Sequence, residues 1–192
     1  ACEILYTLTR ASGLRIDYLA RTDRPTPVNL TNHSYFNLAA HDSDSILDNV
    51  VRIRATRFTE RDETGVPTGR ILPVDDTPLD LRTARAVGER IAELREAGGY
   101  DHNYVIDAWD GETCRLIAEV VEPLRGRRME VHTTCPGVQF YTGNFLTGLR
   151  GKGGVEYNRH AALCLETQFY PDSVNHPDFP STILRPDQTW RQ

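Results

Sequence analysis

The sequence predicts an all-β fold of the sandwich or barrel type. Apolar and polar residues alternate with a period of two in many short stretches, and clusters of Gly, Pro, Asn and Asp separate these stretches. Only one segment shows helical spacing of its apolar residues. Many short strands joined by turns are typical of sheets that pack on sheets, so we expect a β-sandwich or a barrel.

The first two strands are expected to form a hairpin. Residues 3–9 and 14–20 both alternate, and Ala11-Ser12-Gly13 between them is a turn signal. Asp23-Arg24-Pro25-Thr26-Pro27 then interrupts the pattern, and residues 28–32 are predicted to form the next strand. The remaining strand candidates share short alternating or continuous apolar runs, and they are residues 51–58, 104–106, 114–121, 129–133, 138–141 and 162–167.

The segment with helical spacing carries Val87, Ile91 and Leu94, and Gly98-Gly99 ends it. We expect a short surface helix or turn that packs on a sheet. The Pro-, Asn- and Asp-rich residues 172–180 are expected to form an ordered loop, anchored by its apolar side chains at 174 and 179.

Composition narrows the class of protein. The chain has 192 residues, which fits one domain or a large piece of one. Its formal net charge of -5 argues against a nucleic-acid surface, and no apolar run approaches the roughly 20 residues that a bilayer span needs. The four cysteines form no Cys-x-x-Cys pair, so we expect reduced thiols in a cytoplasmic protein, with neither a zinc site nor a disulfide framework.

The first candidate site is the polar and aromatic stretch 29–38 around His33. Histidine titrates near neutral pH and can donate or accept a proton there, and its neighbours supply hydroxyls and amides for a polyol. Two other interpretations stay open on local pattern. Asn29-Leu30-Thr31 and Asn32-His33-Ser34 both match the acceptor pattern of N-glycosylation, and His33 could equally be a hydrogen-bonded core histidine.

The second candidate is Glu166, which interrupts the apolar strand Leu163-Cys164-Leu165. On a two-residue alternation, Glu166 shares a face with Cys164 and lies opposite Leu165. A carboxylate on a half-buried strand has to be paired, solvated or functional. An exposed position at the edge of a sheet explains the pattern equally well.

Two further stretches carry side chains suited to binding. Gly98 to Asn103 lies between the helical segment and a strand, and Asp101 with His102 could form a metal pair, although adjacent residues of a strand rarely chelate together. Gly137 to Asn144 places Gln139 and Tyr141 on one strand face, as a partner for a sugar hydroxyl and for a ring. An ordinary polar strand face is the alternative, and we expect no metal.

Taken together, these stretches resemble the aldose 1-epimerase (galactose mutarotase) family. The resemblance covers essentially the whole chain and rests on five motifs in the order of the family: Thr31 to Leu38, Gly99 to Asn103, Gly137 to Phe145, Leu165 to Gln168, and Phe179 to Pro186. It implies a large antiparallel β-sandwich that holds a sugar in an open cleft.

The resemblance also implies roles for individual residues. His33 of the Asn-His-Ser-Tyr motif would be the general acid, and Glu166 of the Glu-Thr-Gln motif the general base. Ser34, Tyr35, Asp101 and Gln139 match positions that line the sugar site. The implied reaction interconverts the α and β anomers of an aldohexose such as glucose or galactose, with a monosaccharide as partner and no cofactor.

The resemblance reaches only the C-terminal portion of such proteins. Their upstream Asn-Arg pair and second histidine have no counterpart here, so we expect residues 1–192 to form a partial mutarotase-like β-sandwich domain, incomplete at the N-terminal side. A missing N-terminal segment or a second chain would then complete the cleft. Three alternatives remain: a non-catalytic carbohydrate-binding β-sandwich, an enzyme similar to hexose-6-phosphate 1-epimerases, and a structural interaction domain.

Overall fold

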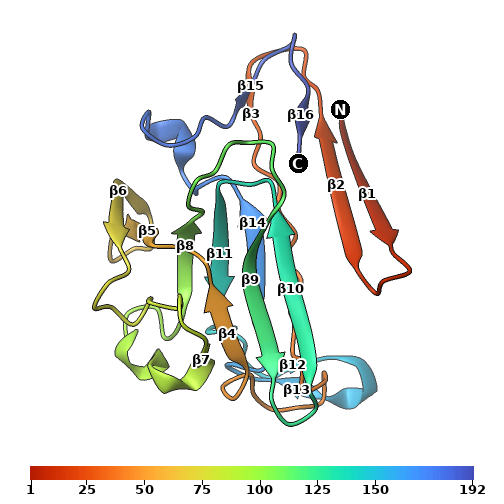
Figure 1. Ribbon diagram of the computed structural model, residues 1–192, viewed down its shortest axis with the longest axis vertical. Coiled ribbons are helices and arrows are strands. Elements are labelled where there is room, and N and C mark those ends of the chain that lie inside the picture. The colour runs from red at the N-terminus through yellow and green to blue at the C-terminus, as the bar shows by residue number, and fades with distance from the viewer.

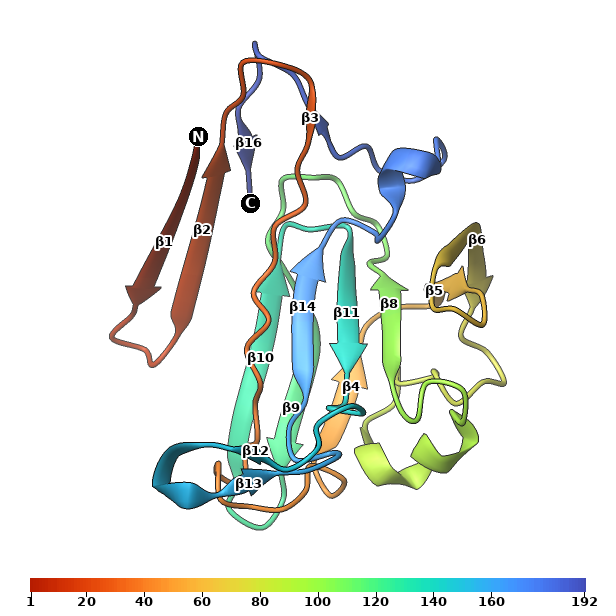
Figure 2. The same cartoon turned by 180° about the vertical axis from the view of Figure 1, so that it is seen from behind.

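Two antiparallel sheets form the body of the protein in a computed structural model that describes residues 1–192. One sheet has five strands in the order β14-β11-β8-β5-β6 and the other has four in the order β10-β9-β4-β7, and the two lie one behind the other (Figures 1 and 2). Their bounds are β4 Val50–Ile53, β5 Arg57–Arg61, β6 Pro67–Pro73, β7 Arg85–Ala86, β8 Asp101–Val105, β9 Arg115–Glu122, β10 Arg127–Thr133, β11 Gly137–Tyr141 and β14 Cys164–Gln168. The expected antiparallel β-sandwich is confirmed.

Three small sheets and four 3₁₀ turns lie outside the two main sheets. Three short sheets are the hairpin β1 (Cys2–Leu8) and β2 (Leu14–Ala20) with β16 (Trp190–Arg191), the pair β3 (Thr26–Pro27) and β15 (Ile183–Leu184), and the pair β12 (Leu149–Arg150) and β13 (Glu156–Tyr157). The helical elements are single 3₁₀ turns: η1 Val87–Glu89, η2 Ile91–Glu93, η3 Lys152–Gly154 and η4 Ser173–Asn175. None of them has the length and the apolar character that crossing a bilayer requires.

The core lies between the two main sheets and follows from strand alternation. Val51 and Ile53 of the four-stranded sheet belong to the same buried cluster as Tyr104, Val138 and Phe140 of the five-stranded sheet. Burying a large apolar side chain stabilises a fold by roughly 1.5–3 kcal/mol. Because successive residues of a strand point to opposite faces, the second face of the five-stranded sheet is free to carry polar side chains.

The hairpin β1–β2 stands away from this core (Figure 2). Every residue of β1 is exposed, and Leu8 keeps 80% of its surface in contact with solvent. Leu5, Tyr6 and Leu14 are exposed as well. The predicted hairpin is confirmed, but its apolar side chains have no covering layer in this chain.

Two expectations about strands need correction. Residues 28–32 form no strand, because the Asn29 side chain takes the place of a strand neighbour: its Oδ1 accepts from the Phe169 N–H and its Nδ2 donates to the Phe169 carbonyl, both at 2.9 Å. Residues 51–58 are divided between β4 and β5, which belong to different sheets.

The segment with helical spacing forms short turns, one of the two forms expected for it. It consists of two 3₁₀ turns separated by Arg90, whose φ of -128° lies outside the helical range. In the loop 172–180, Phe179 is buried as an anchor, whereas Val174 is exposed.

Candidate active site

The second face of the five-stranded sheet gathers polar side chains from neighbouring strands. The pairing sets Gln139 of β11 opposite Glu166 of β14 on one side and opposite Asn103 of β8 on the other. Tyr141 is likewise opposite Cys164 and Asp101. Residues that lie opposite one another on antiparallel strands project to the same face, so these motifs from distant parts of the sequence form one surface.

His33 reaches this surface from a segment that is not itself a strand. Phe36 and Leu163 form an antiparallel bridge with hydrogen bonds of 2.8 and 2.9 Å in the two directions. Continuing this pairing by three residues in each direction brings His33 opposite Glu166. Nε2 of His33 lies 3.4 Å from Oε1 of Glu166, with side chains that are 50% and 9% exposed.

The segment around His33 is held by asparagines on both sides. Asn29 is bonded to Phe169 as described, and Asn37 Nδ2 donates to the Ala161 carbonyl at 2.9 Å while its Oδ1 accepts from the Ala39 N–H at 2.9 Å. The amide nitrogen that a glycan would modify on Asn29 therefore holds the backbone in place. These contacts explain why an irregular segment can present His33 at a defined position.

Burial controls the protonation of Glu166. Removal from water raises its pKa above the usual value, the positive charge available on His33 lowers it, and the negative charge of Asp101 raises it further; the net direction is upward. A raised pKa makes the ionised carboxylate a stronger base than a free glutamate. The pair therefore combines a buried carboxylate with a half-exposed imidazole.

Asp101 and Gln139 lie on the same face of the sheet as Glu166, and their side chains are hydrogen-bonded to each other. Gln139 Nε2 donates to Asp101 Oδ1 at 2.7 Å, and Arg61 Nη1 lies 3.6 Å from Asp101 Oδ2. Gln139 Oε1 is buried and has no hydrogen-bond partner. A buried acceptor without a partner is costly, so this oxygen is suited to receive a hydroxyl from a ligand.

Aromatic rings border the imidazole. The ring of Tyr35 stacks on His33 with centroids 5.0 Å apart, and Tyr141 meets both rings edge-on at 6.1 and 6.3 Å. Phe145 stacks on Tyr141 at 6.2 Å. Ser34 is different, because its one hydrogen bond joins its backbone N–H to Asn32 Oδ1 at 3.2 Å. The structure thus brings Tyr35, Asp101 and Gln139 together with His33 and Glu166, and shows no side-chain hydrogen bond from Ser34 to them.

His102 lies on the opposite, apolar face of the sheet, where its ring meets Phe58 edge-on at 6.2 Å. Burial first, and then the charge of Arg61, lower the pKa of His102 to about 3, so it is neutral at neutral pH. Its Nδ1 accepts from the Asp101 N–H at 3.1 Å. Because adjacent strand residues face apart, the metal pair that Asp101 and His102 suggested in the sequence does not form.

Thr142 and Asn144, at the end of the stretch 137–144, hold the turn that precedes Asp101. Asn144 Nδ2 donates to the Tyr100 carbonyl at 2.9 Å, and the Tyr100 N–H donates to Thr142 Oγ1 at 3.0 Å. A Cβ on Gly99 would come within 2.3 Å of Asn144 Oδ1, so only glycine fits there. Thr142 and Asn144 thus fix the start of β8, and with it the position of Asp101.

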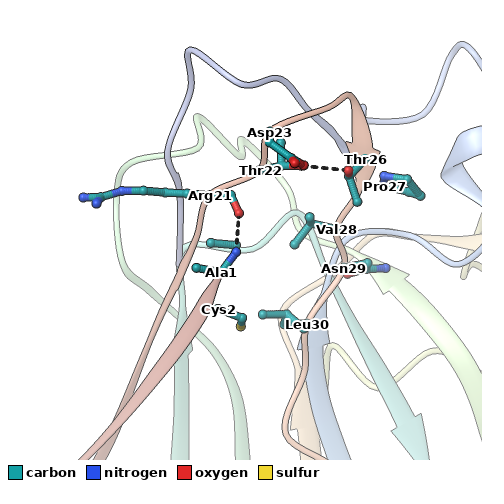
Figure 3. A pocket seen from close by; sticks show the side chains of 11 residues that line it. Ala1, Cys2, Arg21, Thr22, Asp23, Thr26, Pro27, Val28, Asn29 and Leu30 are labelled. Carbon is teal, nitrogen blue, oxygen red and sulfur yellow. Dashed lines mark hydrogen bonds between the residues drawn. The ribbon is translucent and has the colours of Figure 1, made fainter.

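Sequence reasoning assigned no role to Arg61 and none to Cys164. Arg61 is on β5, among several arginines of similar local pattern, and only the sheet pairing shows that it reaches Asp101. A cavity of about 800 Å³ lies elsewhere, between the start of β1, the end of β2 and residues 26–30 (Figure 3). It contains neither His33 nor Glu166.

Comparison with known proteins agrees with this fold and this arrangement of motifs. The sequence matches the model of the aldose 1-epimerase family over residues 1–192, and the chain belongs to that family. It is 47% identical to the galactose mutarotase of Mus musculus and 45% identical to that of Homo sapiens, in each case over 97% of this chain and 54% of the relative. The aldose 1-epimerase of Escherichia coli is 35% identical, over 97% of this chain and 55% of the relative.

Two solved structures have folds similar to that of this chain. The aldose epimerase homologue of C. elegans superimposes with a TM-score of 0.84 at 29% identity, over 98% of this chain and 56% of that one. The galactose 1-epimerase of Lactobacillus acidophilus has a TM-score of 0.82 at 22% identity, which concerns the fold alone. The chain spans about half the length of the curated relatives it matches.

Proposed function

We propose that this chain carries the general acid and the general base of an aldose 1-epimerase that interconverts the α and β anomers of an aldohexose such as glucose or galactose. The observation that carries the proposal is the half-exposed His33 imidazole 3.4 Å from the buried Glu166 carboxylate on a polar sheet face. The galactose mutarotases of mouse and human, at 47% and 45% identity, support this class of substrate.

In the proposed reaction Glu166 takes the proton from the hydroxyl on C1. The electron pair of that O–H bond forms the carbonyl, the bond between C1 and the ring oxygen breaks, and the ring oxygen takes a proton from His33. Rotation about the C1–C2 bond followed by the reverse transfers gives the other anomer. The hydroxyl and ring oxygens are both bonded to C1, so an acid and a base that are neighbours can serve both. Each positioned transfer contributes roughly 10²–10⁴-fold.

The raised pKa of Glu166 fits the role of the base. Burial strengthens its attraction for a proton, while a protonated His33 keeps part of the carboxylate population ionised. After ring opening Glu166 holds the proton and His33 is neutral, which is the protonation state that ring closure needs. The pair therefore returns to its starting state without a cofactor.

We assign hydroxyl recognition to Asp101, Gln139 and Ser34, and packing against the sugar ring to Tyr35. Gln139 Oε1 is a buried acceptor without a partner, and Asp101 offers carboxylate oxygens that Gln139 and Arg61 hold in place. Ligand hydroxyls would satisfy these groups, which is worth more in a desolvated site than in water. Tyr35 is exposed beside His33 and presents its ring to the same space.

We further propose that residues 1–192 are part of one β-sandwich domain, whose cleft a missing N-terminal segment or a second chain completes. The exposed apolar side chains of the β1–β2 hairpin support this, because such a surface is ordinarily covered. The four cysteines are free, which supports a cytoplasmic location.

Polarimetry tests the proposed reaction. In the complete natural protein, freshly dissolved α-galactose or α-glucose should lose its excess rotation faster than in buffer. His33→Gln, which keeps a hydrogen-bond donor but cannot transfer a proton, should slow this by roughly 10²-fold or more. Sugar that binds without faster exchange would instead indicate a carbohydrate-binding module, and exchange confined to hexose 6-phosphates would indicate the phosphate-specific enzyme class.

A further inference from the structure

One buried thiol beside the acid–base pair has no part in the proposed reaction. Cys164 begins β14 two residues before Glu166 and on the same face of the sheet, and it is fully buried. It forms no disulfide. A free buried cysteine commonly acts as a small apolar residue, but this one adjoins two further metal-binding side chains.

The three side chains are close enough to share one ion. One ligand atom each from His33, Cys164 and Glu166 lies within 4.8 Å of the other two, and the His33 Nε2 to Glu166 Oε1 distance is 3.4 Å. Zinc bonds of about 2.0–2.3 Å in a tetrahedron place neighbouring ligand atoms roughly 3.3–3.7 Å apart. The imidazole and carboxylate already have this spacing, and the thiol has to approach by no more than about 1 Å. His33 is half exposed and lies outside the regular strands, so its ring has room to adjust.

The ligand atoms also select the kind of cation. A thiolate with an imidazole and a carboxylate suits Zn²⁺, whereas Mg²⁺ and Ca²⁺ prefer sites made of oxygen. The Asp101 carboxylate acts on both Cys164 and Glu166 and makes the surroundings more negative, although Arg61 offsets part of its charge from 3.6 Å. Three protein ligands leave a fourth position for water on the open side near His33.

We propose that His33, Cys164 and Glu166 form a binding site for Zn²⁺, and that the bound ion switches off the acid–base pair. Coordination replaces the proton of the Cys164 thiol and occupies the Nε2 and the carboxylate oxygen that would otherwise transfer protons. Zn²⁺ therefore acts as a reversible inhibitor that competes with the sugar. This site is additional to the proposed reaction, which uses no metal.

Binding can be measured on this chain without any sugar. Cys2 and Cys114 are exposed and could bind the metal on their own, so both are first replaced by serine. Calorimetric titration with Zn²⁺ should then show one ion per chain, and Co²⁺ in its place should produce a thiolate-to-cobalt charge-transfer absorption. Mg²⁺ should give neither signal.

Single substitutions identify the ligands. Cys164→Ser and Glu166→Gln should each weaken Zn²⁺ binding by at least about 10-fold, since even residues behind a metal's direct ligands are commonly worth that much. Cys135→Ser, at the other buried cysteine, is the matched control and should leave binding unchanged. Far-ultraviolet circular dichroism confirms that each variant is folded, and Glu166→Gln keeps the test decisive if Cys164→Ser does not fold.

Two results would overturn the inference: equal Zn²⁺ affinity in the parent and in both ligand variants, or no thiolate-to-cobalt absorption in the parent. In the complete natural protein, Zn²⁺ should slow anomer exchange in the parent and not in Cys164→Ser, whose rate without the metal should match the parent's. Because calorimetry and absorption need no sugar, failure of the zinc site and failure of the proposed reaction give different results.

Discussion

The two faces of the five-stranded sheet are built from alternate residues of the same strands, yet they have opposite chemistry. Phe140 and Leu165 point into the core, while their neighbours Gln139 and Glu166 point to the candidate active site. The two histidines show the same contrast. His102 lies on the apolar face, where burial lowers its pKa to about 3, whereas His33 is half exposed beside Glu166.

The position of the candidate site therefore depends on the pairing register of the strands more than on the identity of any one strand. A slip of one residue would exchange the two faces and bury the carboxylates in the core. The apolar face therefore fixes the position of the polar face. We expect that substitutions of adjacent residues change the stability and the activity separately.

Glu166→Gln should reduce anomer exchange by roughly 10²–10⁴-fold, because the amide has the shape of the carboxylate and cannot take a proton. The free energy of unfolding at pH 7 should not fall. Since the pKa of Glu166 is raised in the fold, the stability it contributes is present below the ordinary value of 4.5 and is lost as pH rises through the raised pKa, and Gln lacks this loss. Polarimetry and urea denaturation measure the two effects, and a variant with full activity would disprove the role of Glu166.

Phe140→Ala, on the other face, should lower the free energy of unfolding by about 3–5 kcal/mol, because it leaves a cavity in the buried cluster. The midpoint of urea denaturation reports this change. Without urea, and at a temperature where Phe140→Ala remains folded, the activity of this variant should exceed that of Glu166→Gln. The opposite ranking would show that the two faces are not separable.

His102→Asn should make the stability less dependent on pH. A buried histidine with a pKa of about 3 contributes stability that is complete above its ordinary value of 6.5 and is lost as pH falls toward 3. The parent should therefore lose up to about 1.4 kcal/mol per pH unit below 6.5 that the variant does not lose. Urea denaturation from pH 7 to pH 5 checks this, and parallel curves for the two proteins would place His102 in water.

Asp101→Asn should move the acid side of the rate profile to lower pH. The negative charge of Asp101 raises the pKa of Glu166, so its removal lets Glu166 ionise at lower pH. The substitution should also raise KM for the sugar, because Asp101 is assigned to hydroxyl binding. The pH dependence of kcat separates the two effects; an unchanged acid limb would mean that the charge of Asp101 does not reach Glu166.

The fold was largely predictable because strand alternation is a local property of the sequence. Residues 114–121 and 129–133 were predicted as strands within a residue or two of β9 and β10. Local pattern failed where side chains replace strand hydrogen bonds, as Asn29 does at residues 28–32, and where one alternating run serves two sheets, as at residues 51–58.

The candidate site was predictable only in part. Resemblance to the family indicated His33 and Glu166, but their distance depends on a bridge between Phe36 and Leu163, which are far apart in the sequence. Arg61 and Cys164 carried no local signal, since an arginine on a strand and a cysteine in an apolar run are common. Their relation to Asp101 and to Glu166 exists only in the assembled sheet.

The β1–β2 hairpin has a practical consequence for handling this chain. β1 is the outer strand of its small sheet, so one side of its backbone offers unpaired N–H and C=O groups alongside exposed Leu5 and Leu8. Open strand edges with apolar side chains recruit further strands from other molecules. At high concentration the isolated chain should therefore self-associate through β1, and a lysine in place of Leu5 should keep it dispersed.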